Sequence, residues 1–465
     1  MTPLLGRPLA VANVGVDFLA DELERQGVPV ARVDWQPPDH AAVEPLRLLA
    51  THAARVADAN GLAVQKLQEA DPQIVGVGRA HDVLQGMTER TILHAGPPIE
   101  WEDMSGPLRG AVIGAALHEG LAIDAADAAR MAAAGEFEFG PCHDRGAVGP
   151  MAGVVSASMP MVIIEDATHG HRAFCTFNEG LGKVLRYGAY DGEVLDRLRW
   201  IDRVLAPTFA LALKSLGEPI RLRPLIAQAL EMGDEAHNRN RAATSLLLRA
   251  LLPALIELDA PSHEVADVAR FISRNDHFFL NFSMPAAKCA ADSAAGVPAS
   301  SIVVAMARNG TEFGVRVSGT GARWFTAPAA KVDELFLSSY GPGNANRDIN
   351  DNTITETIGL GGFAMAAAPA IVGFVGGEVE DALRFSKSMY DICWSESESY
   401  RIPALGFRGT ALGIDSARIV QTGVVPVINT GIAHREPGVG QIGAGLVKPP
   451  IEPFAAAVRA LADSL

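Results

Sequence analysis

The sequence predicts a multi-domain α/β protein with a Rossmann-like N-terminal domain, a small all-helical domain and further α/β domains. Three observations support this fold class. The chain has 465 residues, about three times the ~150 residues that are typical of one domain. The first quarter alternates short apolar runs with helical periodicity, and the stretch 194–295 is helical in pattern throughout. The last third returns to apolar runs separated by turn residues.

The N-terminal domain is predicted over residues 1–122. Its predicted strands are 9–13, 28–33, 74–78 and 91–94, and its predicted helices are 17–26 and 40–70. Alternation of this kind favours a doubly wound parallel sheet. A dinucleotide-binding loop has three glycines, whereas the segment 13–17 has only Gly15, although the acidic Asp34 ends the second strand at a suitable distance. We therefore expect a Rossmann-like shape without a bound NAD.

Three further domains are predicted, over residues 123–190, 191–295 and 296–465. The first contains a glycine- and proline-rich stretch at 135–153 and a hairpin whose strands, 161–165 and 172–177, flank a turn at 168–170. The second is the helical domain. The third is α/β and opens with a hairpin around Asn309-Gly310, two residues that both tolerate positive φ.

The composition excludes several classes of partner. There are 39 Lys and Arg against 54 Asp and Glu, a net charge of −15, which repels nucleic acid and anionic lipid. The four cysteines form no C-x-x-C pair, which suits a reducing cytoplasm. Residues 358–377 lack charge, but their Ala and Gly content and Pro369 favour a buried helix over a membrane span. We expect a cytoplasmic protein that binds neither nucleic acid nor membranes.

One glycine pattern matches a cofactor fingerprint. Gly438-x-Gly440-x-x-Gly443 has dinucleotide-binding spacing, but Pro449 and Pro450 follow soon after, where the mechanism needs a helix, and the chain ends at 465. No Walker loop, nucleophile elbow or H-E-x-x-H motif occurs. No cofactor is expected.

A glycine-flanked segment at 178–186 predicts an anion site. Free N–H groups at paired glycines, together with two cations on one face of a helix that begins here, would cradle an anion. A solvated helix start is the alternative reading. The residues proposed to bind are Asn178, Glu179, Gly180, Gly182, Lys183 and Arg186.

Two further polar clusters interrupt apolar surroundings. Residues 234–240 include His237 and Asn238, and six of these seven residues have side chains that can form hydrogen bonds. Asn275 and Asp276 precede His277, with an N-cap as the alternative reading. We predict these as further parts of a substrate site.

Candidate metal ligands occur at Asp166, His169 and His171, and again at residues 142–144. Neither group has the ligand spacing of a known metal scaffold, so no metal site is predicted. A metal-dependent amidohydrolase of a ureido compound, using the first group, remains an alternative.

Four strings resemble the YlbE/YahG-like family, in order along the chain: NEGLGKVLR at 178–186, NDHFFLN at 275–281, MARNG at 306–310 and PVINTGIAH at 426–434. The resemblance implies a Rossmann-like N-terminal domain, a small helical domain and two unusual α/β domains. Its AllG branch implies a subunit of oxamate carbamoyltransferase that acts in purine-nitrogen breakdown with FdrA-like (AllF) and AllH-like partners. An oligomer is therefore expected.

The first functional hypothesis is a carbamoyltransferase subunit that acts on a small anionic ureido substrate and phosphate. Lys183, Arg186 and Arg308 could bind phosphate, and Asn178 and Asn309 could donate to the carbonyl oxygen. As the catalytic acid we propose His277 or His434, each at the boundary of a core and a loop, where a pKa near neutrality is useful. Both are expected to face one cleft. A non-catalytic scaffold or sensor subunit is a further alternative.

Overall fold

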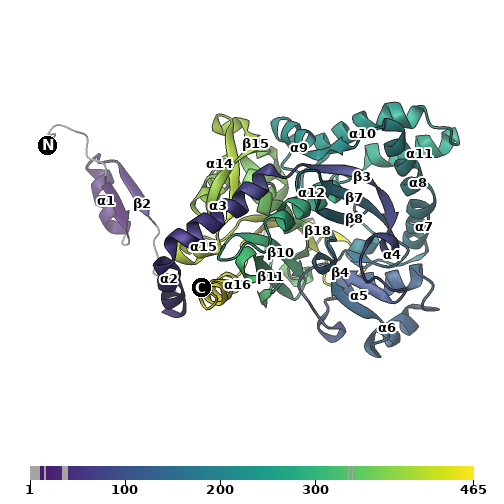
Figure 1. The fold of residues 1–465 in the computed structure, drawn as a ribbon, viewed down its shortest axis with the longest axis horizontal. Coiled ribbons are helices and arrows are strands. Elements are labelled where there is room, and N and C mark those ends of the chain that lie inside the picture. Colours follow the sequence, from purple (N-terminus) through teal and green to yellow (C-terminus); the bar gives the residue numbers. More distant parts are fainter. Residues whose placement is uncertain (1–10, 15–16, 34–39, 333–334, 338) are drawn as a thin grey trace.

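The computed structural model describes residues 11–14, 17–33, 40–332, 335–337 and 339–465. Figure 1 shows a mixed α/β body in which several small sheets are surrounded by helices. The mixed α/β class is confirmed. Gly15 and Asp34, on which the expectation about NAD rested, lie outside the described residues.

The chain begins with a small unit whose predicted order is confirmed. It contains β1 (Val11–Val14), α1 (Asp17–Arg25) and β2 (Val30–Val33), and its two strands pair in parallel. None of its described residues takes part in the larger hydrophobic clusters of the body. The predicted long helix follows as α2 (His40–Thr51) and α3 (Ala53–Glu69).

The doubly wound parallel sheet predicted within residues 1–122 is wrong. β3 (Pro72–Arg79) pairs antiparallel with β7 (Pro160–Asp166) and β9 (Ile220–Arg221), in a sheet of order β8-β7-β3-β9. β4 (Thr91–His94) lies in another sheet, of order β5-β4-β6. The periodicity located these strands, but a strand's partner depends on distant segments that local pattern does not specify.

Both predicted hairpins are confirmed. β7 pairs antiparallel with β8 (Arg172–Thr176), and β10 (Val303–Asn309) pairs antiparallel with β11 (Glu312–Val317). Gly310 has φ +87 in the turn of the β10–β11 hairpin, a backbone conformation that residues other than glycine rarely adopt. The remaining elements of residues 80–155 are α4 (Ala80–Val83), α5 (Gly106–His118), α6 (Ala125–Ala133), β5 (Glu138–Pro141) and β6 (Val154–Val155).

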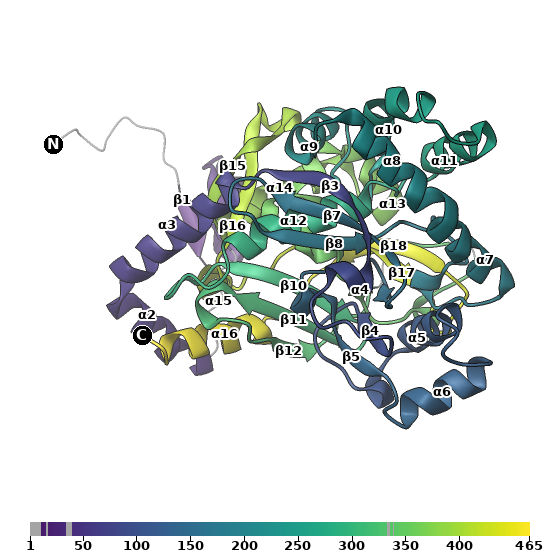
Figure 2. The same cartoon turned by 45° about the vertical axis from the view of Figure 1, so that its right-hand side comes forward.

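The predicted helical stretch 194–295 is mainly helical, and the short strand β9 and loops such as 232–240 interrupt it. It contains α7 (Gly192–Trp200), a π-helical turn (Ile201–Leu205), α8 (Ala206–Leu216), α9 (Leu222–Glu231), α10 (Arg241–Ile256), α11 (Ser262–Arg274) and α12 (Leu280–Ser293). In Figure 2 the teal helices α8 to α11 lie at one end of the body, whereas α12 lies within it. Nearly every residue of α12 is buried, because it packs against β7, β8 and the segment Asn352–Ile358.

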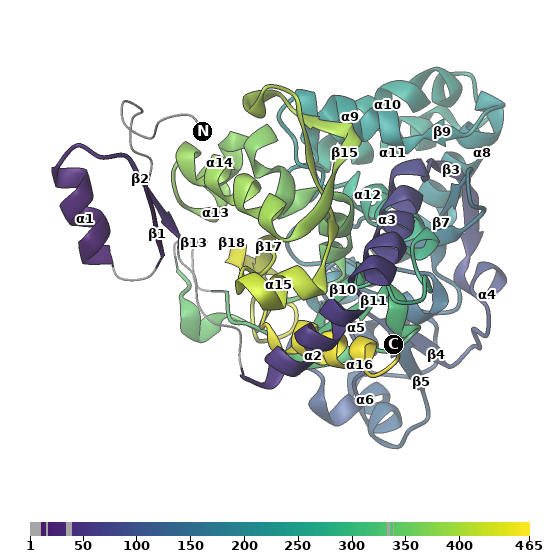
Figure 3. The same ribbon diagram turned by 60° about the vertical axis from the view of Figure 1, so that its left-hand side comes forward.

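The C-terminal region combines short strands with 3₁₀ segments. Its strands are β12 (Phe325–Pro328), β13 (Leu335–Phe336), β14 (Ile349–Asn350), β15 (Cys393–Ile402), β16 (Arg408–Ile414), β17 (Ile428–Ala433) and β18 (Gln441–Val447). Its helices are α13 (Val372–Val375), α14 (Val379–Ser388), α15 (Ser416–Thr422) and α16 (Glu452–Ala462). Figure 3 shows α13, α14 and β15 on one side of the body.

The uncharged stretch 358–377 is not the single buried helix that we predicted. It contains two 3₁₀ segments, Gly361–Ala367 and Pro369–Ile371, before α13. Pro369 lacks an N–H and cannot continue a helix from the residues before it. No helix within the described residues is long and apolar enough to cross a membrane.

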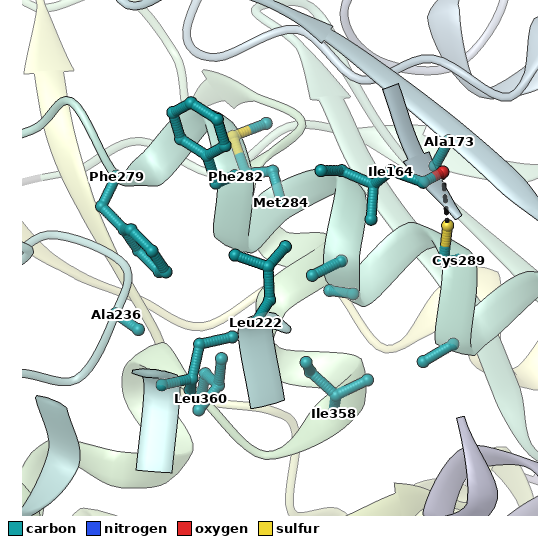
Figure 4. Packing of buried hydrophobic residues seen from close by; sticks show 14 of the residues in the cluster. Ile164, Ala173, Leu222, Ala236, Phe279, Phe282, Met284, Cys289, Ile358 and Leu360 are labelled. Atoms are coloured by element: carbon teal, nitrogen blue, oxygen red, sulfur yellow. Dashed lines mark hydrogen bonds between the residues drawn. The ribbon is translucent and has the colours of Figure 1, made fainter. Parts of the chain in front are cut away.

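The largest hydrophobic core joins segments that we predicted to be separate domains. It contains Ala59, Val162, Phe209 and Ile358, one from each predicted domain. Figure 4 shows part of this packing, where side chains of α12 meet Leu222, Ile358 and Leu360. The four boundaries remain a prediction, and the shared core indicates that these segments stabilise one another.

Candidate functional site

The loop 178–188 separates the two cations that we predicted to act together. Gly180 and Gly182 have φ of +99 and +90, and only a three-residue 3₁₀ helix, Leu185–Tyr187, follows. The predicted helix from residue 183 is therefore wrong. The side chain of Lys183 is 58% exposed and pairs with Asp191. Without a helical repeat, the chain turns Lys183 outward and Arg186 inward.

Arg186 is buried, with 4% of its surface exposed. Its Nη2 donates to the carbonyl oxygen of Gly180 at 2.6 Å, while Nε has no partner. Among the described residues, no carboxylate lies within ion-pair distance of its guanidinium. Opposing the effect of burial, the nearby charge of Arg186 acts to lower the pKa of Glu179, so the guanidinium has a carboxylate within electrostatic range but none in direct contact. A buried cation without a contacting counter-ion is costly, so this position favours an anion.

A cavity of about 30 Å³ adjoins Arg186. Its polar lining comes from His118, Thr176 and Glu179, and the rest of the lining is mainly apolar. Burial raises the pKa of Glu179, which accepts from the N–H of Leu185 at 2.7 Å. The cavity has room for a group the size of a carboxylate or a few waters.

Three buried asparagines connect this loop to the start of α12. Asn178 Nδ2 donates to Asn281 Oδ1 at 2.7 Å, and Asn281 Nδ2 donates to the carbonyl oxygen of Thr176 at 2.6 Å. Asn275 Nδ2 donates to Asn178 Oδ1 at 3.1 Å, and Asn275 Oδ1 accepts from the N–H of His277 at 3.2 Å. The structure therefore brings together three predicted site residues, Asn178, Asn275 and His277, through bonds that also fix their amide groups.

His277 does not have the near-neutral pKa that we predicted. Burial lowers its pKa to about 3, with further lowering by the charges of Arg186 and His237. His277 is therefore neutral at pH 7 and lies within electrostatic range of both residues. Its neighbour Asp276 points outward, where 59% of its side chain is exposed and Arg241 lies 3.8 Å away.

The loop 234–240 encloses the carboxylate of Glu235. Backbone N–H groups of Asn238 and Arg239 donate to this carboxylate, and Asn429 Nδ2 of β17 donates to its Oε1 at 3.0 Å. Burial raises the pKa of Glu235 to about 7, and His237 acts in the opposite direction. Glu235 thus exchanges a proton close to neutral pH.

His237 lies between this acid and a second one. Its Nδ1 is 3.1 Å from Glu356 Oε1 and 2.8 Å from Thr355 Oγ1, with no exposed surface on either His237 or Glu356. Within the described part of the chain, His237 Nε2, Asn238 Nδ2 and Asn429 Oδ1 have no hydrogen-bond partner. Unpaired donors and acceptors within one buried cluster are uncommon and indicate a place where water or a small polar molecule binds.

Arg308 and Asn309 have structural partners instead of free donors. Arg308 makes two bonds to Asp348, at 2.6 and 2.8 Å, and its other N–H groups meet further oxygens of residues 350, 352, 353 and 430. Asn309 Nδ2 donates to the carbonyl oxygen of Pro97, and its Oδ1 caps the hairpin turn. All five N–H groups of Arg308 therefore have partners within the described chain, and none is left for phosphate.

His434 follows β17, as its sequence context indicated. Its Nδ1 accepts from the N–H of Glu436 at 3.0 Å, and its ring meets Tyr340 edge-on. The loop after His434 packs against the loop 178–188, because a Cβ on Gly440 would come 2.8 Å from the carbonyl oxygen of Gly182. The convergence of His277 and His434 on one cleft remains a prediction.

The possible metal ligands do not gather into a site. Asp166 accepts from His169 at 2.7 Å, from Ser293 and from two backbone N–H groups, in the turn of the β7–β8 hairpin. Within the described chain, no group of three or more His, Cys, Asp or Glu side chains is placed to hold a metal ion. The glycines 438, 440 and 443 lie in the β17–β18 turn and the start of β18, so a strand and not a helix N-terminus directly follows the first two glycines.

Sequence analysis missed the buried polar segment 348–357. Eight of its ten residues are polar and every one is buried, including Asp348, Asp351 and Glu356. Burial raises the pKa of Asp351 to about 7, although the N–H groups of Gly96 and Gly149 donate to it. The dense run of Asn, Asp and Thr was the available signal, because so many short polar side chains suit a hydrogen-bonded core.

Comparison with known proteins identifies a matching family model and two relatives of this chain. A family model described as oxamate carbamoyltransferase subunit AllG matches residues 137–352. The chain is 46% identical to the uncharacterized protein YahG of Escherichia coli K12 over 460 residues, which cover 98% of this chain and 97% of YahG. It is 47% identical to the oxamate carbamoyltransferase subunit AllG of the same organism over 412 residues, 88% of this chain and 98% of AllG.

A solved structure has the same fold. The crystal structure of a conserved protein of unknown function from Enterococcus faecalis V583 is similar to this chain with a TM-score of 0.87 and 48% identity. The match covers 88% of this chain and 98% of the other. The resemblance found in the four sequence strings is confirmed over most of the chain.

Proposed function

Because this chain belongs to the AllG family, we propose that it is a subunit of a carbamoyl-transferring enzyme in purine-nitrogen breakdown. Its reaction converts oxalurate and phosphate to oxamate and carbamoyl phosphate, or uses a related ureido compound. The proposed partners are FdrA-like and AllH-like subunits in the cytoplasm. The 47% identity to a protein named as an oxamate carbamoyltransferase subunit supports this proposal.

The reaction sets three chemical requirements. A phosphate oxygen forms a bond to the ureido carbonyl carbon, and the bond from that carbon to the amide nitrogen breaks. The proton that phosphate loses replaces the lost bond on nitrogen, which yields oxamate. The site must therefore hold anions, stabilise negative charge on the carbonyl oxygen and deliver one proton.

Arg186 meets the first requirement and is the observation that carries the proposal. Its guanidinium is buried beside a small cavity without a close carboxylate partner. Planar guanidinium groups bind carboxylates in a forked geometry. We assign the carboxylate of oxalurate or oxamate to this cavity, with His118 and Thr176 in its wall.

Glu235 suits the proton transfer better than His277. With a pKa of about 7 it is partly protonated at neutral pH, so it can donate to the departing nitrogen and be recharged. His277 is neutral, and a neutral imidazole N–H can donate to the carbonyl oxygen without changing its own charge. An amide substrate has both hydrogen-bond donors and acceptors, so it can pair with the unpaired His237 Nε2 and Asn429 Oδ1.

The test is activity of the assembled enzyme with single substitutions. The chain is purified with the FdrA-like and AllH-like proteins of the same organism, and carbamoyl phosphate formed from oxalurate and phosphate is measured. Arg186→Gln should reduce kcat/KM by roughly 10²-fold or more, because a buried charge-assisted contact is lost. Lys183→Gln, at the exposed cation of the same loop, is the matched control and should keep the wild-type rate.

Two outcomes would contradict the proposal. If Arg186→Gln folds and turns over normally, the arginine cavity does not bind substrate and the chain is better explained as a scaffold subunit. If the assembled wild-type proteins form no carbamoyl phosphate from any ureido compound tried, the reaction is a different one.

A further inference from the structure

We propose that a pocket beside β4 binds a flat ligand that carries N–H groups, at a site separate from the Arg186 cavity. The pocket has a volume of about 430 Å³, within the range of small-molecule sites. It lies between the residues after β4, the end of α6 and the start of the segment after β5. None of its lining residues lines the Arg186 cavity.

The inner wall of the pocket contains His94, which has no exposed surface. Its Nδ1 lies 2.9 Å from the carbonyl oxygen of Ala95. A carbonyl oxygen only accepts, so Nδ1 carries the proton and Nε2 has a lone pair. Burial lowers the pKa of His94 to about 4, which keeps the ring neutral at pH 7. Among the described residues no donor reaches Nε2, so this buried lone pair in the pocket wall is an acceptor that the folded chain leaves without a partner.

Aromatic rings form another wall. The rings of Trp101 and Phe139 are nearly parallel, at 13° with centroids 6.4 Å apart, and Phe137 meets Phe139 edge-on. The guanidinium of Arg109 lies 5.4 Å from the Trp101 ring centroid and helps to hold that ring. Flat aromatic faces favour flat ligands, by stacking and by cation–π attraction.

The charges around the pocket select against anions. Glu100 and Glu102 are exposed lining residues, and neither has an ion-pair partner among the described residues. The cation in the lining, Arg145, is held by Glu138 at 3.2 Å and by the carbonyl oxygen of Gln85. Acidic groups therefore dominate the opening, which repels oxamate and phosphate but attracts N–H-rich or cationic groups.

These three features define one ligand class: a flat nitrogen heterocycle or amidine that is neutral or cationic and has at least one N–H. The N–H reaches His94 Nε2, the flat face lies on the aromatic wall, and any positive charge lies near Glu100 and Glu102. Such a ligand differs in charge from both substrates of the proposed reaction, so this site goes beyond that function.

The experiment measures binding of three probes to the full chain by calorimetry at pH 7. Adenine is the neutral probe, benzamidine the cationic probe, and benzoate the flat anionic control. Adenine or benzamidine should bind with a Kd below 1 mM, and benzoate should bind at least tenfold more weakly. Trp101→Leu and His94→Gln should each weaken binding at least tenfold.

Trp394→Leu is the matched control, because Trp394 is also half-buried and has an arginine 5.0 Å from its ring centroid. It lies outside the pocket and should leave binding unchanged. The proposal is overturned if neither adenine nor benzamidine binds the wild-type chain, if benzoate binds as tightly, or if folded Trp101→Leu and His94→Gln variants both bind normally. The binding measurement does not use the activity of the assembled enzyme. A failure of the pocket proposal can therefore be distinguished from a failure of the carbamoyl-transfer proposal.

Discussion

His237 Nδ1 lies 3.1 Å from Glu356 Oε1, and neither side chain has any exposed surface. The two residues are 119 positions apart and come from a loop before α10 and a 3₁₀ segment after β14. A buried histidine–carboxylate contact holds the ring in one orientation and directs its other nitrogen away from the acid. That nitrogen, Nε2, is unpaired. The contact therefore organises the cluster around Glu235 in which we place the proton transfer.

Glu235→Gln should lower turnover of the assembled enzyme by roughly 10²-fold, because the amide cannot donate a carboxylic proton. A donor works in its protonated form, so the wild-type rate should fall as pH rises through about 7, where Glu235 loses its proton. The measurement is kcat as a function of pH. Glu231→Gln, at an exposed carboxylate on α9, is the control. An unchanged pH profile in Glu235→Gln would assign the inflection to another group.

His277→Gln and His434→Gln should each reduce turnover by roughly 10²-fold if both rings contact the substrate. Because the pKa of His277 is lowered to about 3, its loss should change the rate without changing the shape of the profile between pH 5 and 9. Steady-state kinetics of both variants give the answer, with His263→Gln on the exposed part of α11 as control. Normal turnover in both folded variants would remove the two histidines from the site.

Arg308→Met should destabilise the chain by about 3–5 kcal/mol, since it leaves the buried Asp348 carboxylate without its cation. Urea unfolding followed by circular dichroism measures this. Arg130→Met is the matched control: Arg130 pairs with Asp127 at 2.8 Å but is 61% exposed, so its loss should leave the unfolding free energy close to that of wild type. A stable Arg308→Met variant with weakened phosphate binding would restore the role that the sequence first indicated.

His94 should make the protein sensitive to acid. Its pKa falls from 6.5 to about 4 in the folded chain. Between these pH values the His94 ring is therefore protonated in the unfolded chain and neutral in the native chain. Stability from this group is therefore present above pH 6.5 and is lost as pH falls toward 4. The loss is about 3 kcal/mol.

Urea unfolding of wild type and His94→Gln at pH 7, 6, 5 and 4 checks this. Toward pH 4 the unfolding free energy of wild type should fall, relative to that of His94→Gln, by most of the loss given above, because glutamine does not titrate. Parallel curves for the two chains across this range would show that His94 takes up its proton in both states.

The sequence by itself determined the elements whose cause is local. The Asn309-Gly310 turn specified the β10–β11 hairpin, because a left-handed turn of that type needs glycine whatever surrounds it. Helical periodicity also identified the stretch 194–295 as helical, and α10 and α11 lie within it. The four strings also indicated the family correctly. They include the loops around Arg186, His277 and Asn429, where segments far apart in the chain meet.

Only the tertiary structure decided which side chains share a surface. Lys183 and Arg186 look equivalent in the sequence, yet one is exposed and the other buried, because the loop turns at two glycines instead of forming a helix. Arg308 looks like a free cation until Asp348 is placed beside it. Strand partners, counter-ions and burial come from residues far apart in the chain, and the desolvation that sets the pKa of Glu235 depends on that packing.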